Sequence, residues 1–481
     1  MKIHAIAERP SALPTLVSGQ DHRAMREMLS LVSPDVGPVL RAASFLGSGA
    51  AAGGGYAAHA ELLDLDGLLR DLYQQPSMEP GVNDTLFGGG KGFRFDTTVL
   101  STLGEAAERV VATLVCGTPD LPGLRILGSW NDLNAGGVNA LHPTAVRLFS
   151  DAQYDSPGFL YERFMPESVI QWVAGRHLRS GEEVYVPSQL VDMVHIYDHG
   201  EQIVGYPVSG GLSCHTSEGA ATYHGLTEVL ERDAVNVSWY TAVQPLRIKI
   251  DADARKLLGT FADRLTLDHT EAEILVHPST VTSAATVSMV GLQGWLRRRA
   301  YCAGGGCDAV LETAVRKAAA EFGQTRSTLG ISVCAPRSAV GMSVERMFDW
   351  EPDRPLVDMQ LFFQAIGYYG LIEHRDLLDH YLSGPEVTIE ELRDTARPTP
   401  ESSISSRLEH LLDELAEHEI DPIVLNYSHP DWTALSIVKL YVPELTTPFL
   451  QSRPMLGHPR LSPLRDGVID ENGTILPLPY P

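Results

Sequence analysis

The sequence predicts a mixed α/β fold of the α+β class, in which helices that carry pairs of polar residues pack on sheets. Three segments show helical periodicity, at 99–114, 224–235 and 315–326, and each places two polar side chains on one side of its helix. Segments such as 169–173 and 435–442 alternate or are rich in β-branched residues, which indicates strands. Hydrophobic residues make up 44% and charged residues 20% of the chain, as in a globular protein with a large core.

The overall charge and the cysteine content exclude several classes of protein. The 481 residues include 37 Lys and Arg against 61 Asp and Glu, a net charge of −24, so neither nucleic acid nor an anionic membrane is expected as a partner. No apolar run approaches the roughly 20 residues of a membrane span. Five cysteines, an odd number without a CxxC pair, fit a reducing compartment rather than disulfides or structural zinc. The chain is therefore expected in the cytoplasm.

The segment 224–235 carries Glu228 and Glu231, whose spacing puts both on the same side of a helix. Arg232 follows directly, and apolar residues at helical spacing form a stripe that would attach the helix to a core. Taken alone, the segment also fits an exposed helix with a Glu228–Arg232 ion pair, which contributes only a few tenths of a kcal/mol. Repetition of the pattern elsewhere in the chain favours a functional role.

The first repetition lies near the N-terminus of the chain. Glu105 and Glu108 have the same spacing and are followed by Arg109, while Ser101 lies one helical turn ahead of Glu105. Asp96 and Thr97 precede this segment and are suitable N-caps for a helix over 99–114.

The third segment places Glu321 and Gln324 three residues apart, with Arg326 beyond them. Three helices that each offer a polar pair suggest one convergent site. Carboxylates gathered there would repel one another unless cations were present, and Mg²⁺ binds oxygen ligands together with substrate phosphates. Arginine suits phosphate oxygens. The sequence therefore predicts a Mg²⁺–nucleotide site.

The glycine-rich run 88–92 contains Lys91 and is a further candidate for anion binding. Consecutive glycines allow backbone N–H groups to approach a phosphate, and the lysine adds positive charge. The run does not match the Walker pattern GxxxxGK[ST]. A plain hairpin connection explains it equally well, and the sequence leaves both explanations open.

Other segments predict the elements between these motifs. Strands are expected at 158–161, 169–173, 183–191, 202–207, 247–251, 272–276, 281–290, 422–426 and 435–442, helices at 21–29, 252–267 and 403–418, and a lid or surface excursion at 385–400. The segment 57–72 has the character of both helix and strand. Thr216, Ser217 or Glu218 is expected to cap the helix at 224–235.

These motifs, in this order, resemble the ATP-binding helices of YcaO-domain proteins. The resemblance includes the SxxxExxER, ExxERD and ExxQxR segments, continues through 172–175, 186–191 and 209–213, and ends with the PxPxP sequence at 477–481 that is typical of azoline-forming members. It covers the chain from about residue 29 to the end. The chain departs from the family at Gly210, where Asn is common, and at Ala220, where an acid is common; Glu218 is a candidate replacement for that acid.

The resemblance implies one large YcaO domain over 29–481, with internally similar halves around an ATP cleft, preceded by an N-terminal extension over 1–28. It implies that 463–481 is a proline-rich tail entering the active site, with the carboxylate of Pro481 as catalytic general base or proton shuttle. The implied metal ligands are Glu105, Glu108, Glu228 and Glu231. The implied nucleotide-binding residues are Lys91, Ser101, Arg109, Thr216, Arg232, Glu321, Gln324 and Arg326.

The implied function is an ATP- and Mg²⁺-dependent cyclodehydratase that converts Cys, Ser or Thr of a ribosomal precursor peptide into a thiazoline or oxazoline. The implied partners are the precursor peptide, a leader-binding protein acting in trans, a flavin dehydrogenase if azoles are the product, and a second copy of the chain in a homodimer. The alternatives are a family member that makes a thioamide or amidine, and an inactive nucleotide-binding scaffold. For the tail, the alternatives are a disordered segment or a docking peptide for an SH3-like module.

Overall fold

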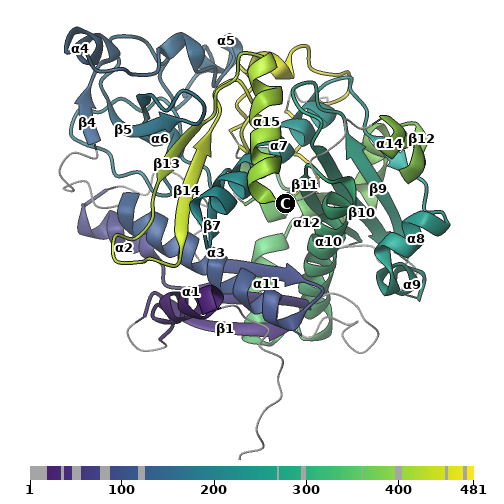
Figure 1. Cartoon of the computed structure of the whole chain (residues 1–481). Coiled ribbons are helices and arrows are strands. Elements are labelled where there is room, and N and C mark those ends of the chain that lie inside the picture. The colour runs from purple at the N-terminus through teal and green to yellow at the C-terminus, as the bar shows by residue number, and fades with distance from the viewer. Residues whose placement is uncertain are drawn as a thin grey trace, which may run out of the picture.

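The computed structural model describes residues 19–33, 37–45, 56–75, 87–116, 125–267, 270–293, 300–359, 361–395, 403–449, 453–469 and 474–480. They form three sheets with helices packed between and around them (Figure 1). In the view of Figure 1, the first sheet lies at the bottom, the second at the right and the third at the left. The predicted mixed fold of helices and sheets is confirmed.

The first sheet is an antiparallel meander of β1 (Val39–Phe45), β2 (Tyr56–Leu62) and β3 (Phe87–Gly92). Helix α3 (Phe95–Cys116) follows β3 directly and packs on β2 and β3. Helix α1 (Gly19–Leu29) buries Ala24 and Met28 against α3. The expected boundary between residues 28 and 29 therefore falls inside α1, which contributes to the core of the molecule.

The second sheet contains another antiparallel meander, β9 (Thr270–His277), β10 (Ala285–Gln293) and β11 (Tyr301–Asp308), extended by β8 (Leu246–Ile248) and β12 (Glu386–Val387). Helix α10 (Leu311–Cys334) follows β11 and packs on β10 and β11. It also reaches β2 and β3 of the first sheet. The helix thus joins the first two sheets.

The third sheet has the strand order β4 (Arg125–Gly128), β5 (Ile170–His177), β13 (Ile423–Asn426), β14 (Ser436–Tyr441) and β7 (Leu212–His215), with β6 (Glu183–Pro187) paired to β5. Helix α7 (Glu218–Tyr240) packs on β7 and β14 and also contacts β10 and β11. Ser217 caps α7 by accepting a hydrogen bond from the amide of Ala220. This helix, which carries the ExxERD motif, therefore lies between the second and third sheets.

The remaining helices are α2 (Leu65–Leu72), α4 (Trp130–Ala135), α5 (Asp151–Tyr154), α6 (Ser188–Val191), α8 (Ala252–Leu258), α9 (Thr260–Leu267), α11 (Ala339–Phe348), α12 (Phe362–Tyr369), α13 (Asp379–Leu382), α14 (Ile389–Thr395) and α15 (Ile404–Glu417). Short 3-10 turns occur at 143–145, 356–358, 372–378 and 459–461.

The two meander–helix units share an unusual packing feature, a run of three glycines on the strand before the helix. A Cβ atom added to Gly88 of β3 would lie 2.9 Å from the backbone nitrogen of Ala106 in α3. The equivalent atom at Gly304 of β11 would lie 2.0 Å from that of Phe322 in α10. Only glycine permits this close approach of strand and helix. The correspondence agrees with the expectation of internally similar halves.

Several local predictions are wrong. The explanation of the glycine-rich run 88–92 as a hairpin connection is wrong, because the run is part of β3 and its glycines accommodate α3. Helix α3 already begins at Phe95, so Asp96 and Thr97 lie inside it and do not cap it. No strand forms at 158–161 or 202–207, where the described chain is irregular.

Other segments divide where the sequence suggested one element. The ambiguous segment 57–72 contains both β2 and α2. The helix expected over 252–267 breaks into α8 and α9 at Gly259, whose φ of 58° is left-handed. The described part of 385–400 forms β12, which pairs with β8 in the second sheet, and the helix α14.

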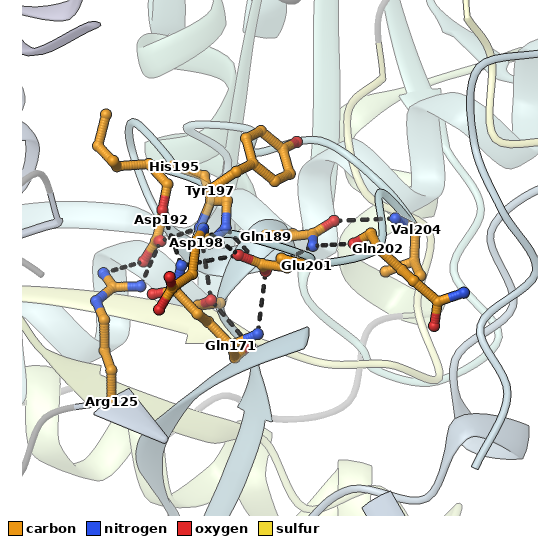
Figure 2. A network of polar contacts seen from close by, with 12 residues as sticks. Arg125, Gln171, Gln189, Asp192, His195, Tyr197, Asp198, Glu201, Gln202 and Val204 are labelled. Atoms are coloured by element: carbon orange, nitrogen blue, oxygen red, sulfur yellow. Dashed lines mark hydrogen bonds and ion pairs between the residues drawn. The ribbon is translucent and has the colours of Figure 1, made fainter. Parts of the chain in front are cut away.

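A buried polar network ties the end of α3 to the third sheet (Figure 2). Arg125 of β4 donates two hydrogen bonds to Asp192, at 2.8 and 2.9 Å, and a third to the carbonyl of Cys116 at 3.2 Å. The ring of His195 lies between two carboxylates, with Nδ1 2.8 Å from Asp192 and Nε2 3.1 Å from Glu201. The alternation of positive and negative groups compensates for burial of charge.

Candidate functional site

The three helices with polar pairs converge on Lys91 of β3. The Nζ atom of Lys91 lies 3.0 Å from Oε1 of Glu321 on α10. Burial by itself would lower the pKa of Lys91, but Glu321, Glu105 and Glu231 together raise it. Acids from α10, α3 and α7 must therefore lie near one amine. The structure brings the three segments together although more than two hundred residues separate the first from the last.

On α10, Glu321 and Gln324 face the glycine strands. The amide of Gly305 donates a hydrogen bond of 3.0 Å to Oε2 of Glu321. Burial opposes ionisation of Glu321, but Lys91 and Arg232 outweigh it and lower its pKa. A Cβ atom added to Gly89 would lie 2.5 Å from Nε2 of Gln324. The missing side chain at Gly89 thus leaves room for the amide of Gln324.

On α3, both glutamates of the predicted metal site accept hydrogen bonds from backbone amides. Glu105 accepts one from Gly89, and Glu108 accepts one of 3.0 Å from Cys214 at its Oε2 atom. Arg109 lies 3.5 Å from Glu105. Burial raises the pKa of Glu105 and raises that of Glu108 well above its usual range. These acids are thus held in place at a cost in charge repulsion and desolvation.

On α7, Glu228 accepts a hydrogen bond of 3.2 Å from the amide of Gly211. Glu231 is only 8% exposed, and burial raises its pKa to about 7. The hydroxyl of Tyr480 donates to its Oε1 atom at 2.5 Å. The guanidinium of Arg232 lies 4.9 Å from the centre of the Tyr480 ring. The explanation of this segment as an exposed helix is wrong, because most of α7 is buried.

The described part of the tail runs through the interior to Glu231. The hydroxyl of Tyr369 donates to the carbonyl of Pro477, and that of Tyr301 to the carbonyl of Pro479, each at 2.6 Å. Tyr480 is fully buried. Pro481, the expected catalytic residue, lies outside the described residues.

Three predicted nucleotide-binding residues lie at the margin of this cluster. Ser101 is exposed on α3, one turn before Glu105. Arg326 follows Gln324 by two residues, a rotation of about 200° around a helix, and it lies beside Cys302 of β11. The amide and hydroxyl of Thr216 lie 2.9 and 3.2 Å from Nδ1 of His215, in the turn between β7 and α7.

Sequence reasoning missed Tyr480 and Lys439. Tyr480 lies within the PxPxP motif, whose prolines carry the resemblance to the family, and no local pattern marks its hydroxyl. Lys439 is a lysine within the apolar strand β14 and is only 2% exposed. A lysine within an apolar strand indicates that its amine has polar partners, because burial of an unpaired amine is costly in free energy.

The donor set fits a nucleotide with its divalent cation. Among the residues that the structure describes, no three His, Cys, Asp or Glu side chains are close enough to hold a metal ion by themselves. Mg²⁺ commonly binds one or two carboxylates and completes its shell with phosphate oxygens and water. Burial raises the pKa values of Glu105, Glu108 and Glu231 and so disfavours their ionised form, which a bound cation would stabilise.

A family model described as "YcaO cyclodehydratase, ATP- and Mg²⁺-binding" matches residues 89–446. The chain belongs to the YcaO family. The match includes the helices α3, α7 and α10, and the predictions of the family and of its ATP and Mg²⁺ cofactors are confirmed. A comparison with curated protein sequences finds no match.

Solved structures show the same fold. A heterocyclase in complex with substrate and cofactor has a TM-score of 0.66 and 19% identity, covering 88% of this chain and 52% of its own. YcaO from Methanopyrus kandleri, bound with AMPPCP and Mg²⁺, has a TM-score of 0.56 and 17% identity, covering 89% and 90%. The E. coli microcin synthetase McbBCD complex with pro-MccB17 has a TM-score of 0.58 and 13% identity, covering 92% and 96%. This YcaO chain thus spans about half the length of the first of these.

Within the described part of this YcaO chain, no helix has the length and apolar character that crossing a membrane requires.

Proposed function

We propose that this YcaO-family chain is the ATP-dependent cyclodehydratase of a ribosomal peptide-modification system. The observation that carries the proposal is the convergence of α3, α7 and α10 on Lys91, with the PxPxP tail buried against Glu231. In such a reaction, a Cys, Ser or Thr side chain attacks the preceding backbone carbonyl. Phosphorylation of the former amide oxygen then provides a good leaving group, and loss of phosphate gives the azoline.

The residues have separate parts in this proposal. Glu105, Glu108, Glu228 and Glu231 would hold Mg²⁺ together with phosphate oxygens of the nucleotide, and the cation would neutralise phosphate charge. Lys91, Arg109 and Arg232 lie among these acids and bind phosphate oxygens. The marginal positions of Ser101, Thr216 and Arg326 suit the outer parts of the nucleotide, and Glu321 and Gln324 hold Lys91 and the glycine strand in place.

The C-terminal tail has the remaining role in this proposal, which is proton transfer. Tyr480 hydrogen-bonds to Glu231, and we propose the carboxylate of Pro481, the next residue, as the proton acceptor. Two buried tyrosines, Tyr369 and Tyr301, hold the carbonyls of Pro477 and Pro479 in this tail. The proposed YcaO domain is residues 29–481, with 463–481 as this tail, and the preceding residues of α1 pack against it.

The proposed partners follow from the similar structures. McbBCD is a complex of several proteins with its peptide bound, and the matching part of the first heterocyclase is about half of a longer chain. We infer that a leader-binding protein acts in trans with this chain on a precursor peptide in the cytoplasm. A homodimer and a separate flavin dehydrogenase complete the proposed system.

Mass spectrometry of a candidate precursor tests this function. The precursor is incubated with the chain, its partner, ATP and Mg²⁺, and each azoline is expected to remove one water. A mass gain from sulfur would instead indicate a thioamide-forming enzyme. If no ATP is turned over with all components present, whether or not the peptide is added, the chain is a scaffold rather than an enzyme.

A further inference from the structure

Lys439 is a buried lysine that the proposed reaction does not yet use. It lies on β14 and is 2% exposed. Its neighbours Val438 and Leu440 belong to the core cluster that also contains Leu226 and Leu230 of α7. Because side chains alternate across a strand, Lys439 points to the opposite face of β14. Its amine is therefore not part of the apolar contact with α7.

The amine of Lys439 binds two main-chain carbonyls. It donates hydrogen bonds to Val208 and, at 2.7 Å, to Gly210. Burial lowers the pKa of Lys439 to about 8, so most molecules carry the charged amine at pH 7. A buried charge is retained at such a position only where it makes compensating contacts. Here the compensating contacts fix the segment that precedes β7.

That segment orients two of the proposed metal ligands. The amide of Gly211 donates to Glu228 of α7 at 3.2 Å, and the amide of Cys214 donates to Glu108 of α3 at 3.0 Å. The carbonyl of Gly211 is itself bound by the amide of Leu440, the residue after Lys439. One short stretch of backbone, held by β14, thus contacts an acid from each of two helices.

We propose that Lys439 is a positioning residue for the metal site: by holding the carbonyls of Val208 and Gly210, it sets the amides that orient Glu228 and Glu108. The inference rests on the proposed function only in treating these two glutamates as Mg²⁺ ligands. Groups that orient ligands from outside the coordination shell typically change metal affinity by about 10- to 100-fold when removed.

The test compares Lys439→Met with the wild-type chain in two measurements. Amide hydrogen exchange of peptides covering 208–214, measured without nucleotide, is expected to accelerate at least tenfold. Calorimetric affinity for Mg²⁺–ATP is expected to weaken by about 10- to 100-fold. Lys249→Met, a change at an exposed lysine, is the matched control and is expected to alter neither.

The two measurements separate this inference from the proposed function. Wild-type protein that does not bind Mg²⁺–ATP would refute the function, while exchange would still report on the role of Lys439. Unchanged exchange in Lys439→Met overturns the positioning role, even if affinity falls, because the lysine would then act directly on the ligand. If Lys439→Met does not fold, Lys439→Gln replaces it in the test. Its side-chain amide can still donate a hydrogen bond, so its exchange rate is expected to lie between those of wild type and a chain without the amine. A folded Lys439→Gln chain that exchanges at the wild-type rate also contradicts the proposal.

Discussion

The hydroxyl of Tyr480 lies 2.5 Å from Oε1 of Glu231, a hydrogen bond between residues 249 positions apart in the sequence. It joins the last described residue of the tail to the middle of the helix α7. The guanidinium of Arg232 covers the same tyrosine ring. The tail is therefore part of the acid cluster.

Tyr480→Phe removes the hydroxyl and keeps the ring beneath Arg232. We expect turnover to fall by about 10- to 100-fold, because Glu231 loses the group that orients it, while the free energy of unfolding changes by about 1 kcal/mol. Steady-state ATP turnover with precursor and chemical denaturation measure the two effects. Tyr427→Phe, which removes a buried hydroxyl bound to the carbonyl of Val191, is the control and should keep its activity. Equal activity in the two variants would contradict the prediction.

Glu231→Gln keeps the size of the side chain and removes its charge. Turnover is expected to fall by orders of magnitude, whereas Glu162→Gln, at an exposed position hydrogen-bonded to Gln202, should be near wild type. The free energy of unfolding of Glu231→Gln, in contrast, should rise. The folded-state pKa of Glu231 is raised to about 7 from 4.5, so the folded state binds more protons and wild-type stability falls as pH rises between these values. Thermal unfolding should show that Glu231→Gln is more stable than wild type, and that this stability difference is larger at pH 8 than at pH 5. A stability difference that does not change with pH would refute the raised pKa of Glu231.

Gly305→Ala tests the packing of the tail. The added Cβ would lie 1.2 Å from the hydroxyl oxygen of Tyr480, so the tyrosine must move away from Glu231. We expect loss of most turnover in a chain that still folds. Gly330→Ala, on α10 with open space around its Cβ, is the control and should stabilise the helix by up to about 1 kcal/mol. Retained activity in Gly305→Ala would show that the position of Tyr480 does not matter.

Addition of residues after Pro481 tests the proposed role of its carboxylate. Two extra residues replace that carboxylate with a neutral peptide carbonyl and add bulk one residue after the buried Tyr480. Cyclisation is expected to stop while Mg²⁺–ATP binding persists, because the helices that carry the acids are unchanged. Mass spectrometry and calorimetry measure these outcomes, with an N-terminal tag as the control. Full cyclisation by the C-terminally extended chain would exclude the carboxylate from the mechanism.

His195→Gln tests the network of Figure 2. Burial would lower the pKa of His195, but Asp192 and Glu201 outweigh it and raise the pKa above 6.5. The protonated ring therefore stabilises the fold fully below pH 6.5, and this contribution is lost as pH rises through the folded-state pKa. The difference in unfolding free energy between wild type and His195→Gln should be largest at low pH and should shrink above neutrality. A difference that grows with pH would contradict a charged His195.

The sequence alone was enough to determine the class of fold and to predict the acid pairs of the candidate site. The period of a helix puts residues three apart on one side, so Glu105 with Glu108, and Glu228 with Glu231, were identifiable as pairs without coordinates. Their spacing also carried the resemblance to the YcaO family, which the family match confirms. Such features depend on neighbours in the sequence, and local geometry is enough to read them.

Only the tertiary structure decided which distant groups hold these acids. Nothing near Lys439 in the sequence indicates that its amine binds Val208 and Gly210, and nothing near Tyr480 indicates Glu231. The glycines at 88–90 looked like a loop because glycine is permissive, but packing against α3 makes them a strand. These contacts are set by how the sheets and helices pack, and packing depends on residues hundreds of positions apart, which no local pattern encodes.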